Sequence, residues 1–163
     1  MKNINRRNFL KVGFLSSAIV VMNGCEVFGI TTSKETIAVL QNDLFPTAKE
    51  LGIDTVSYMS IISHHSRISK SDKKFIKNGV KWLNEEAVDL YKKSYINLPA
   101  QERQSVLKSI VQTKWGSSWL DTMMRYILEA SLGDPIYGSN KKEAAWKWLS
   151  FEGGLPRPKK AFL

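Results

Sequence analysis

A stripe of apolar residues spaced three and four positions apart constrains the fold of this chain more than any other feature. The stripe predicts one long amphipathic helix that begins after Ser69 or Ser71 and ends before Pro99. Its apolar positions are Ile76, Val80, Leu83, Ala87, Leu90 and Tyr91. No segment shows the alternation of apolar and polar residues that is typical of a strand. We therefore expect an all-α protein, a small irregular helical bundle with an extended C-terminal tail.

Caps and helix breakers place the helices on the N-terminal side of this one. Residues 32–35 have the form of a capping box, so we expect a helix to begin at Thr32. Pro46 ends that helix near Phe45, because a proline disfavours the α conformation of its predecessor. Asp54 is placed to cap a second helix. The core residues expected from these two helices are Ile37, Leu40, Leu44, Val56, Met59 and Ile62.

The C-terminal helices are predicted in the same way. Pro99 suits the first turn of a helix, Gly116 is expected to break it, and Gly133 is expected to end the next one. Residues 155–163 contain two prolines and are expected to be extended, either disordered or draped over a partner. The core residues expected here are Val106, Leu107, Ile110, Leu120, Met123, Met124, Ile127 and Leu128.

The side chains offer no cofactor site, metal site or catalytic set of their own. Cys25 is the only cysteine, so no internal disulfide can form. His64 and His65 are neighbours and would point about 100° apart on a helix, which does not suit one metal ion. No nucleophile accompanies them, so a structural role at a helix end is favoured over a catalytic one.

The net charge of +9 is partly a feature of the N-terminus. Residues 1–24 carry four basic residues and no acidic one, which leaves 20 basic and 15 acidic residues, an excess of +5, for the rest. The remaining lysines include adjacent pairs, which we interpret as solvated helix faces. We expect no nucleic-acid partner, because no basic face is interleaved with stacking aromatic residues.

Residues 1–25 resemble a twin-arginine signal peptide. The motif is carried by Arg6, Arg7, Phe9, Leu10 and Lys11, and only Asn5 departs from the usual serine or threonine. An apolar run over residues 12–22 follows, which is too short to cross a bilayer comfortably but suits a signal. The alternative is a chance Arg-Arg pair before a buried helix. The resemblance implies the twin-arginine translocase as a partner, export to the periplasm, and a mature domain over residues 26–163.

Cys25 follows the apolar run directly after Gly24, as in a lipobox. Met22 and Asn23 replace the residues that a lipobox has earlier. Three readings stay open, namely a lipid on Cys25, a processed signal without a lipid, and an uncleaved anchor. We expect association with the cytoplasmic membrane.

The stretch of residues 132–154 resembles the C-terminal signature of the gluconate 2-dehydrogenase subunit 3 family. The matching residues, in order, are Asp134, Pro135, Tyr137, Gly138, Asn140, Trp146, Lys147, Leu149, Phe151 and Gly153 or Gly154. The departures are Ser139, Ala145 and Ser150 in place of glycines and Glu152 in place of proline. A weaker match near the N-terminus is carried by Asp43, Leu44 and Pro46.

The resemblance implies a non-catalytic small subunit. In this family the catalytic partner is a glucose-methanol-choline-type dehydrogenase subunit that holds FAD, and a multihaem cytochrome c subunit, which holds haem c, often passes electrons to the membrane. The small subunit supplies the export signal and escorts the folded flavoprotein across the membrane. No cofactor is then expected in this chain.

The same stretch is the predicted interface with the partner. Asn140 can cap a short helix that carries Trp146 and Trp148, and one of these indoles can face the core while the other meets a partner. The predicted interface residues are Asp134, Pro135, Tyr137, Gly138, Asn140, Trp146, Trp148 and Phe151. The alternative is that Tyr137, Trp146 and Phe151 simply close the core.

Two other functions compete with this interpretation. One is a standalone enzyme, for which Glu85, Glu86 and Asp89 are the imaginable acid and base groups, although they fall on a polar helix face. The other is an independent periplasmic lipoprotein or interaction module, anchored through Cys25, with no dehydrogenase partner.

Overall fold

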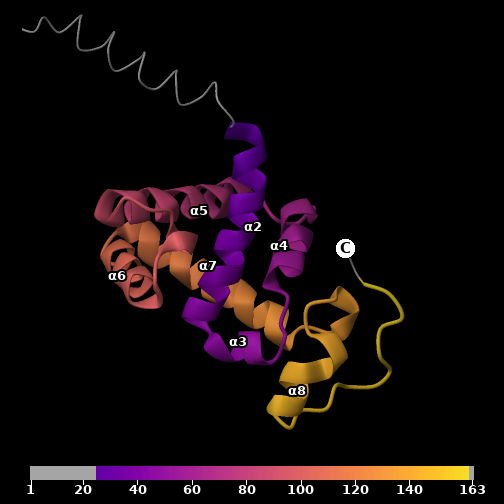
Figure 1. Ribbon diagram of the computed structural model, residues 1–163. Coiled ribbons are helices and arrows are strands. Elements are labelled where there is room, and N and C mark those ends of the chain that lie inside the picture. Colours follow the sequence, from indigo (N-terminus) through magenta and orange to yellow (C-terminus); the bar gives the residue numbers. More distant parts are fainter. Residues whose placement is uncertain (1–24, 162–163) are drawn as a thin grey trace, which may run out of the picture. The chain divides into compact units, whose positions relative to one another are not determined.

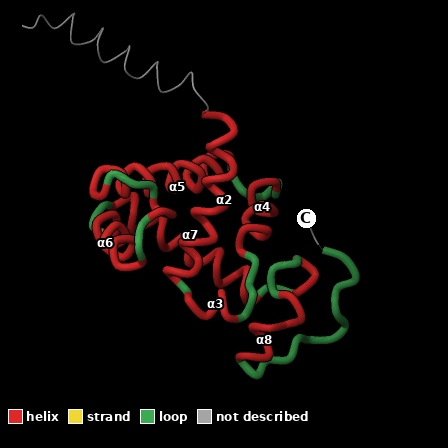
Figure 2. Tube along the Cα trace, in the orientation of Figure 1, coloured by secondary structure: helices red, strands yellow, loops and turns green. Residues whose placement is uncertain are grey.

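The computed structural model describes residues 25–161, and their side chains from residue 33 onward. Helices and connecting loops make up this part of the chain, which contains no strand (Figures 1 and 2). The all-α prediction is therefore confirmed. The α-helices are α2 (Cys25–Leu44), α3 (Pro46–Glu50), α4 (Thr55–His64), α5 (Lys70–Tyr91), α6 (Ala100–Val111), α7 (Lys114–Leu132) and α8 (Ala144–Trp148). Three short 3-10 helices join them, η1 (Tyr95–Asn97), η2 (Pro135–Tyr137) and η3 (Lys141–Glu143).

The chain divides into two units, residues 1–32 and residues 33–163. The arginine motif lies outside the described residues, so the signal peptide stays a prediction. Cys25 is the first residue of α2, but its side chain also lies outside the description. The second unit contains the hydrophobic core.

The core forms where α7 crosses α5. Trp119 of α7 is fully buried, and its indole Nε1 donates a hydrogen bond to the carbonyl of Ile76 at 3.2 Å. The ring lies so close to α5 that a Cβ on Gly79 would overlap it. Glycine at this position therefore sets how closely the two longest helices of the unit approach.

Most of the predicted helix boundaries are confirmed. The Ser69 hydroxyl accepts a hydrogen bond from the Asp72 amide at 3.1 Å and caps α5. The Asp54 carboxylate accepts from the Ser57 amide at 2.9 Å and caps α4. α2 ends at Leu44, before Pro46, and α7 ends immediately before Gly133.

Two predicted boundaries are wrong. α2 is already helical from Cys25, so the capping box at Thr32 lies inside a helix and does not begin one. α6 ends at Val111, and the Thr113 hydroxyl begins α7 by accepting from the Gly116 amide at 3.0 Å. Gly116 therefore lies in the first turn of α7, where a Cβ would overlap the carbonyl of Ile110. This glycine serves close packing, where we had predicted a break.

The periodic stripe identifies most of the core but extends too far. Four of its residues on α5 are buried, as are most of the core residues predicted for α6 and α7. Leu90 and Leu128, however, are 49% and 40% exposed. Leu90 lies in the last turn of α5, where the covering helices no longer reach it, and Leu128 is turned by 100° from its buried neighbour Ile127.

Candidate partner-binding site

The turn after α7 is rigid because its polar groups are bonded to one another. The Asp134 carboxylate accepts from the Ile136 amide at 2.9 Å and caps η2, whose first residue is Pro135. Gly138 follows with a φ of +81°, a conformation that residues with a Cβ rarely adopt. Tyr137 is half-buried.

Asn140 holds this turn from inside. Its side chain is fully buried, its Nδ2 donates to the carbonyl of Gly133 at 3.2 Å, and its Oδ1 accepts from the amide of Ala145 at 3.0 Å. Ala145 lies in the first turn of α8, so Asn140 bonds an amide of that turn, but the N-cap residue of α8 is Glu143 and not Asn140 as predicted. Asn140 thus shapes the turn and offers a partner no surface of its own.

The two indole side chains of α8 point in opposite directions. Trp146 is 8% exposed, and its Nε1 donates to the carbonyl of Leu132 at 2.7 Å. Trp148 is 53% exposed, and its ring meets the edge of Phe45 with centroids 6.2 Å apart. Residues two apart on a helix lie about 200° apart, so one indole fixes α8 to the domain while the other faces solvent.

Three exposed apolar side chains lie within four residues of the chain, Trp148, Leu149 and Phe151, and we call them the aromatic surface. Leu149 is 50% and Phe151 54% exposed, although the Phe151 ring also packs edge-on against Trp146 at 5.4 Å. Large side chains in such positions are typical of protein-binding surfaces when they stand together on a rigid support.

Arg157 holds the C-terminal tail against this support. Its guanidinium lies 4.5 Å from the ring centroid of Trp146 and forms ion pairs with Asp134 at 3.2 Å and Glu143 at 3.0 Å. Gly153 passes under it so closely that a Cβ would lie 2.5 Å from Trp146. Residues 155–161 of the predicted tail form no helix, and Arg157 holds this tail to the chain's own turn.

Two of the glycine replacements in the family signature are compatible with the backbone found here, and one is strained. Ser139 and Ala145 are buried without a positive φ, and the Ser139 hydroxyl donates to the carbonyl of Ala130 at 2.7 Å. Neither position requires glycine. Ser150, in contrast, has a φ of +53°, where glycine would be unstrained.

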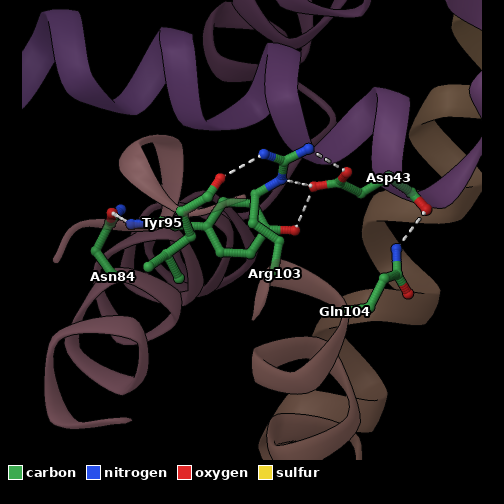
Figure 3. Close-up of polar contacts among 6 residues, drawn as sticks. Asp43, Asn84, Tyr95, Arg103 and Gln104 are labelled. Carbon is green, nitrogen blue, oxygen red and sulfur yellow. Dashed lines mark hydrogen bonds and ion pairs between the residues drawn. The ribbon is translucent and has the colours of Figure 1, made fainter. Parts of the chain in front are cut away.

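A second group of polar side chains joins α2 to η1 and α6 (Figure 3). The Asp43 carboxylate accepts from Nε and Nη2 of Arg103 at 2.6 and 2.9 Å and from the Tyr95 hydroxyl at 2.7 Å. The Arg103 Nη1 also donates to the carbonyl of Leu98 at 2.7 Å. The side chains of Arg103 and Asp43 are only 18% and 7% exposed. This buried ion pair ties the C-terminal end of α2 to α6.

The protonation of these groups follows from their surroundings. Burial, with a hydrogen bond to Asp43, raises the pKa of Tyr95. The hydrogen bond to Asp43 also raises the pKa of Arg103 despite burial. On α4, burial and the charge of Glu129, which accepts from the Tyr58 hydroxyl at 3.1 Å, raise the pKa of Tyr58 to about 12. None of these groups is poised to exchange a proton near neutral pH, as a general acid or base would.

Sequence reasoning missed Arg103, Tyr95 and Arg157. Arg103 and Asp43 are 60 residues apart, and no local pattern joins them. Asp43 itself stood in the weaker N-terminal match, which was the one signal available for this pair. Arg157 was expected in a tail with no contact to its own chain, although an arginine among prolines near a tryptophan-rich segment could have suggested stacking.

The histidines have local partners. Nδ1 of His64 bonds the carbonyl of Ser60 at 2.8 Å at the end of α4, and Nδ1 of His65 accepts from the Arg67 amide at 3.1 Å. Within residues 33–161 no group of three His, Cys, Asp or Glu side chains could hold a metal ion. Among the helices that the structure describes, none has the length and apolar character needed to cross a membrane.

The fold and this site define a small helical protein with an aromatic surface on a rigid C-terminal turn. The chain belongs to the gluconate 2-dehydrogenase subunit 3 family, because the sequence model of that family matches residues 32–154. The match begins at the boundary of the second unit and ends after the aromatic surface. Comparison with curated proteins and with solved structures gave no match. Membership implies a dehydrogenase partner and is consistent with an accessory subunit.

Proposed function

We propose that this chain is a non-catalytic subunit that binds an FAD-containing dehydrogenase subunit and escorts it, already folded, through the twin-arginine translocase into the periplasm. FAD is held by that partner, of the glucose-methanol-choline type, and haem c by a multihaem cytochrome c subunit where one is present. Family membership supports the dehydrogenase partner. The arginine pair at the N-terminus supports the escort.

The observation that carries the proposal is the aromatic surface. Trp148, Leu149 and Phe151 are each about half exposed, yet they stand on a support fixed by Trp146 and Asn140. Exposed tryptophan and phenylalanine on a rigid support bind a partner without a large loss of conformational entropy. Among the carboxylates of α5 suggested for a standalone enzyme, Glu85 pairs with exposed Lys81 at 3.4 Å.

Binding is tested by co-purification of the dehydrogenase partner with Trp148→Ala and Phe151→Ala variants. A tryptophan at the centre of an interface contributes about 2 kcal/mol or more, so we expect affinity to fall about thirtyfold for Trp148→Ala. Leu90→Ala is the matched control, because Leu90 is equally exposed but lies on α5. Undiminished capture by the double variant would disprove the proposed interface.

Escort is tested separately by replacing Arg6 and Arg7 with lysines. We expect the dehydrogenase partner to remain in the cytoplasm, while its capture by this chain is unchanged. If the partner still reaches the periplasm, the escort role is wrong. Mass spectrometry of the mature N-terminus tests the lipid on Cys25. A lipidated chain that captures no dehydrogenase would favour the independent lipoprotein.

A further inference from the structure

We propose that the first half of α5 binds the anionic headgroups of a phospholipid bilayer. Four lysines define this lysine face, namely Lys70, Lys73, Lys74 and Lys77. At 100° per residue they fall within an arc of about 100° on one side of the helix. The buried residues Ile76, Val80, Leu83 and Ala87 lie on another side of α5.

The positive excess of the chain is concentrated here. Residues 70–77 carry four lysines against one acid, Asp72, an excess of +3. Residues 25–163 together carry an excess of +5, so more than half of it lies in these eight residues. A local charge of this size creates a positive potential that attracts anionic surfaces.

Among the described side chains, the lysine face has no carboxylate partner. None of its four ammonium groups pairs with a carboxylate among the described residues, whereas Lys81, one turn further on, pairs with Glu85 at 3.4 Å. Lys70, Lys74 and Lys77 are exposed and Lys73 is half-buried. The charge of the face is therefore available to an outside partner.

The composition of this face favours lipid over protein. Protein interfaces are depleted in lysine and enriched in arginine and aromatic residues, which this chain presents on its aromatic surface instead. A lysine ammonium is a mobile point charge that needs no fixed geometry, so it suits a fluid layer of headgroups. A row of lysines without arginine is thus better matched to a bilayer than to a second protein.

The chain geometry allows both surfaces to be used together. The lysine face and the aromatic surface both lie in the second unit, residues 33–163. Within that unit α5 and α8 lie at opposite ends (Figure 1). Contact of α5 with a membrane therefore leaves the aromatic surface free for a partner.

The test is binding of the full chain to vesicles of phosphatidylcholine alone and to vesicles with about one-third phosphatidylglycerol. The variant carries Lys→Gln at the four positions of the lysine face. The control carries Lys92→Gln, Lys93→Gln, Lys159→Gln and Lys160→Gln, which removes the same charge elsewhere. Both keep the N-terminal segment, so its own affinity for lipid cancels.

We expect the wild-type chain to prefer the anionic vesicles, with a preference that falls as salt is raised. Each lysine near an anionic surface strengthens binding about fivefold, so the lysine-face variant should lose about a hundredfold or more. The control should lose less than about tenfold, because its lysines are scattered. Circular dichroism verifies that both variants are folded.

Three results would overturn the inference. The wild type could bind both vesicle types equally, or the control could lose as much vesicle binding as the lysine-face variant. The third is that the lysine-face variant keeps vesicle binding but no longer captures the dehydrogenase. The last result would make the lysine face a protein interface. Vesicle binding needs no second protein, so the inference stands or fails separately from the proposed function.

Discussion

Replacing Asp43 by asparagine tests whether the buried ion pair holds α2 on the bundle. The substitution keeps the size of the side chain but removes its charge. Arg103 retains its bond to the carbonyl of Leu98, yet its guanidinium loses its counterion while only 18% exposed. We therefore expect Asp43→Asn to destabilise the whole folded unit and not only the end of α2.

The expected magnitude follows from the burial of the pair. Asp43 accepts three hydrogen bonds, two from Arg103 at 2.6 and 2.9 Å and one from Tyr95 at 2.7 Å. Removing one partner of a fully buried pair costs about 3–5 kcal/mol. Because Arg103 keeps some contact with water, we take the lower end, about 3 kcal/mol. In a unit of this size that lowers Tm by about 10 °C.

The assay is urea unfolding followed by circular dichroism, with a double-mutant cycle of Asp43→Asn and Arg103→Gln. The double variant leaves no unpaired charge, so it should cost about 2 kcal/mol less than the sum of the single variants. Tyr95→Phe removes one hydrogen bond to a charged group and should cost about 1.5–3 kcal/mol.

The exposed pair of Lys81 and Glu85 provides the control. Its side chains are 71% and 53% exposed, so Lys81→Gln should change the unfolding free energy by less than about 0.5 kcal/mol. A cost below about 1 kcal/mol for Asp43→Asn, or strictly additive single variants, would refute the reasoning. Either result would mean that solvent screens the Asp43 pair as it screens a surface pair.

Three further predictions concern single positions. Gly79→Ala should lower the unfolding free energy in urea by about 1–3 kcal/mol or more, because the new Cβ overlaps Trp119. Ser150→Gly should raise it by about 0.5–1 kcal/mol, because the φ of +53° strains serine but not glycine. The pKa of Tyr58 is raised to about 12 in the folded state, whereas an unfolded tyrosine loses its proton near pH 10. The contribution of Tyr58 to the unfolding free energy is therefore fully present below pH 10 and is lost as the pH rises from 10 to 12. Tyr58→Phe should reduce this fall, as measured by unfolding at a series of pH values.

Each of these predictions has an outcome that contradicts it. Wild-type stability of Gly79→Ala would mean that α5 and α7 are further apart than described. A loss of stability in Ser150→Gly would mean that the serine makes a contact that outweighs its strain. An unchanged fall above pH 10 in Tyr58→Phe would assign the titration to the other tyrosines with a raised pKa, Tyr95 and Tyr126.

The sequence predicted features that depend on a few neighbouring residues. The caps at Ser69 and Asp54 are such cases, because each side chain bonds an amide three residues further on. The shortness of the helix that carries Trp146 and Trp148 likewise predicted that only one of the two indoles faces the core. Which indole faces inward depends on where the carbonyl of Leu132 lies, and this is set by the tertiary fold.

Features that depend on distant segments were not predicted. A glycine in a sequence can mark either the end of a helix or a close approach of two segments. Only the position of the Ile110 carbonyl shows that Gly116 allows a close approach. Periodicity also cannot tell where a covering helix ends, so the prediction that Leu90 lies in the core was wrong. The partner of Arg157 was missed for the same reason, because its contacts with Asp134 and Glu143 require the tail to turn back.

The unequal burial of the tryptophans has an optical consequence. Trp119 and Trp146 are buried, Trp82 and Trp115 are half-buried, and Trp148 at 53% is the most accessible of the five. A dissolved quencher such as acrylamide collides most often with this ring, so Trp148 dominates the quenchable part of the intrinsic fluorescence. The protein therefore carries an unlabelled reporter in its aromatic surface, and any molecule that covers Trp148 will shield its emission.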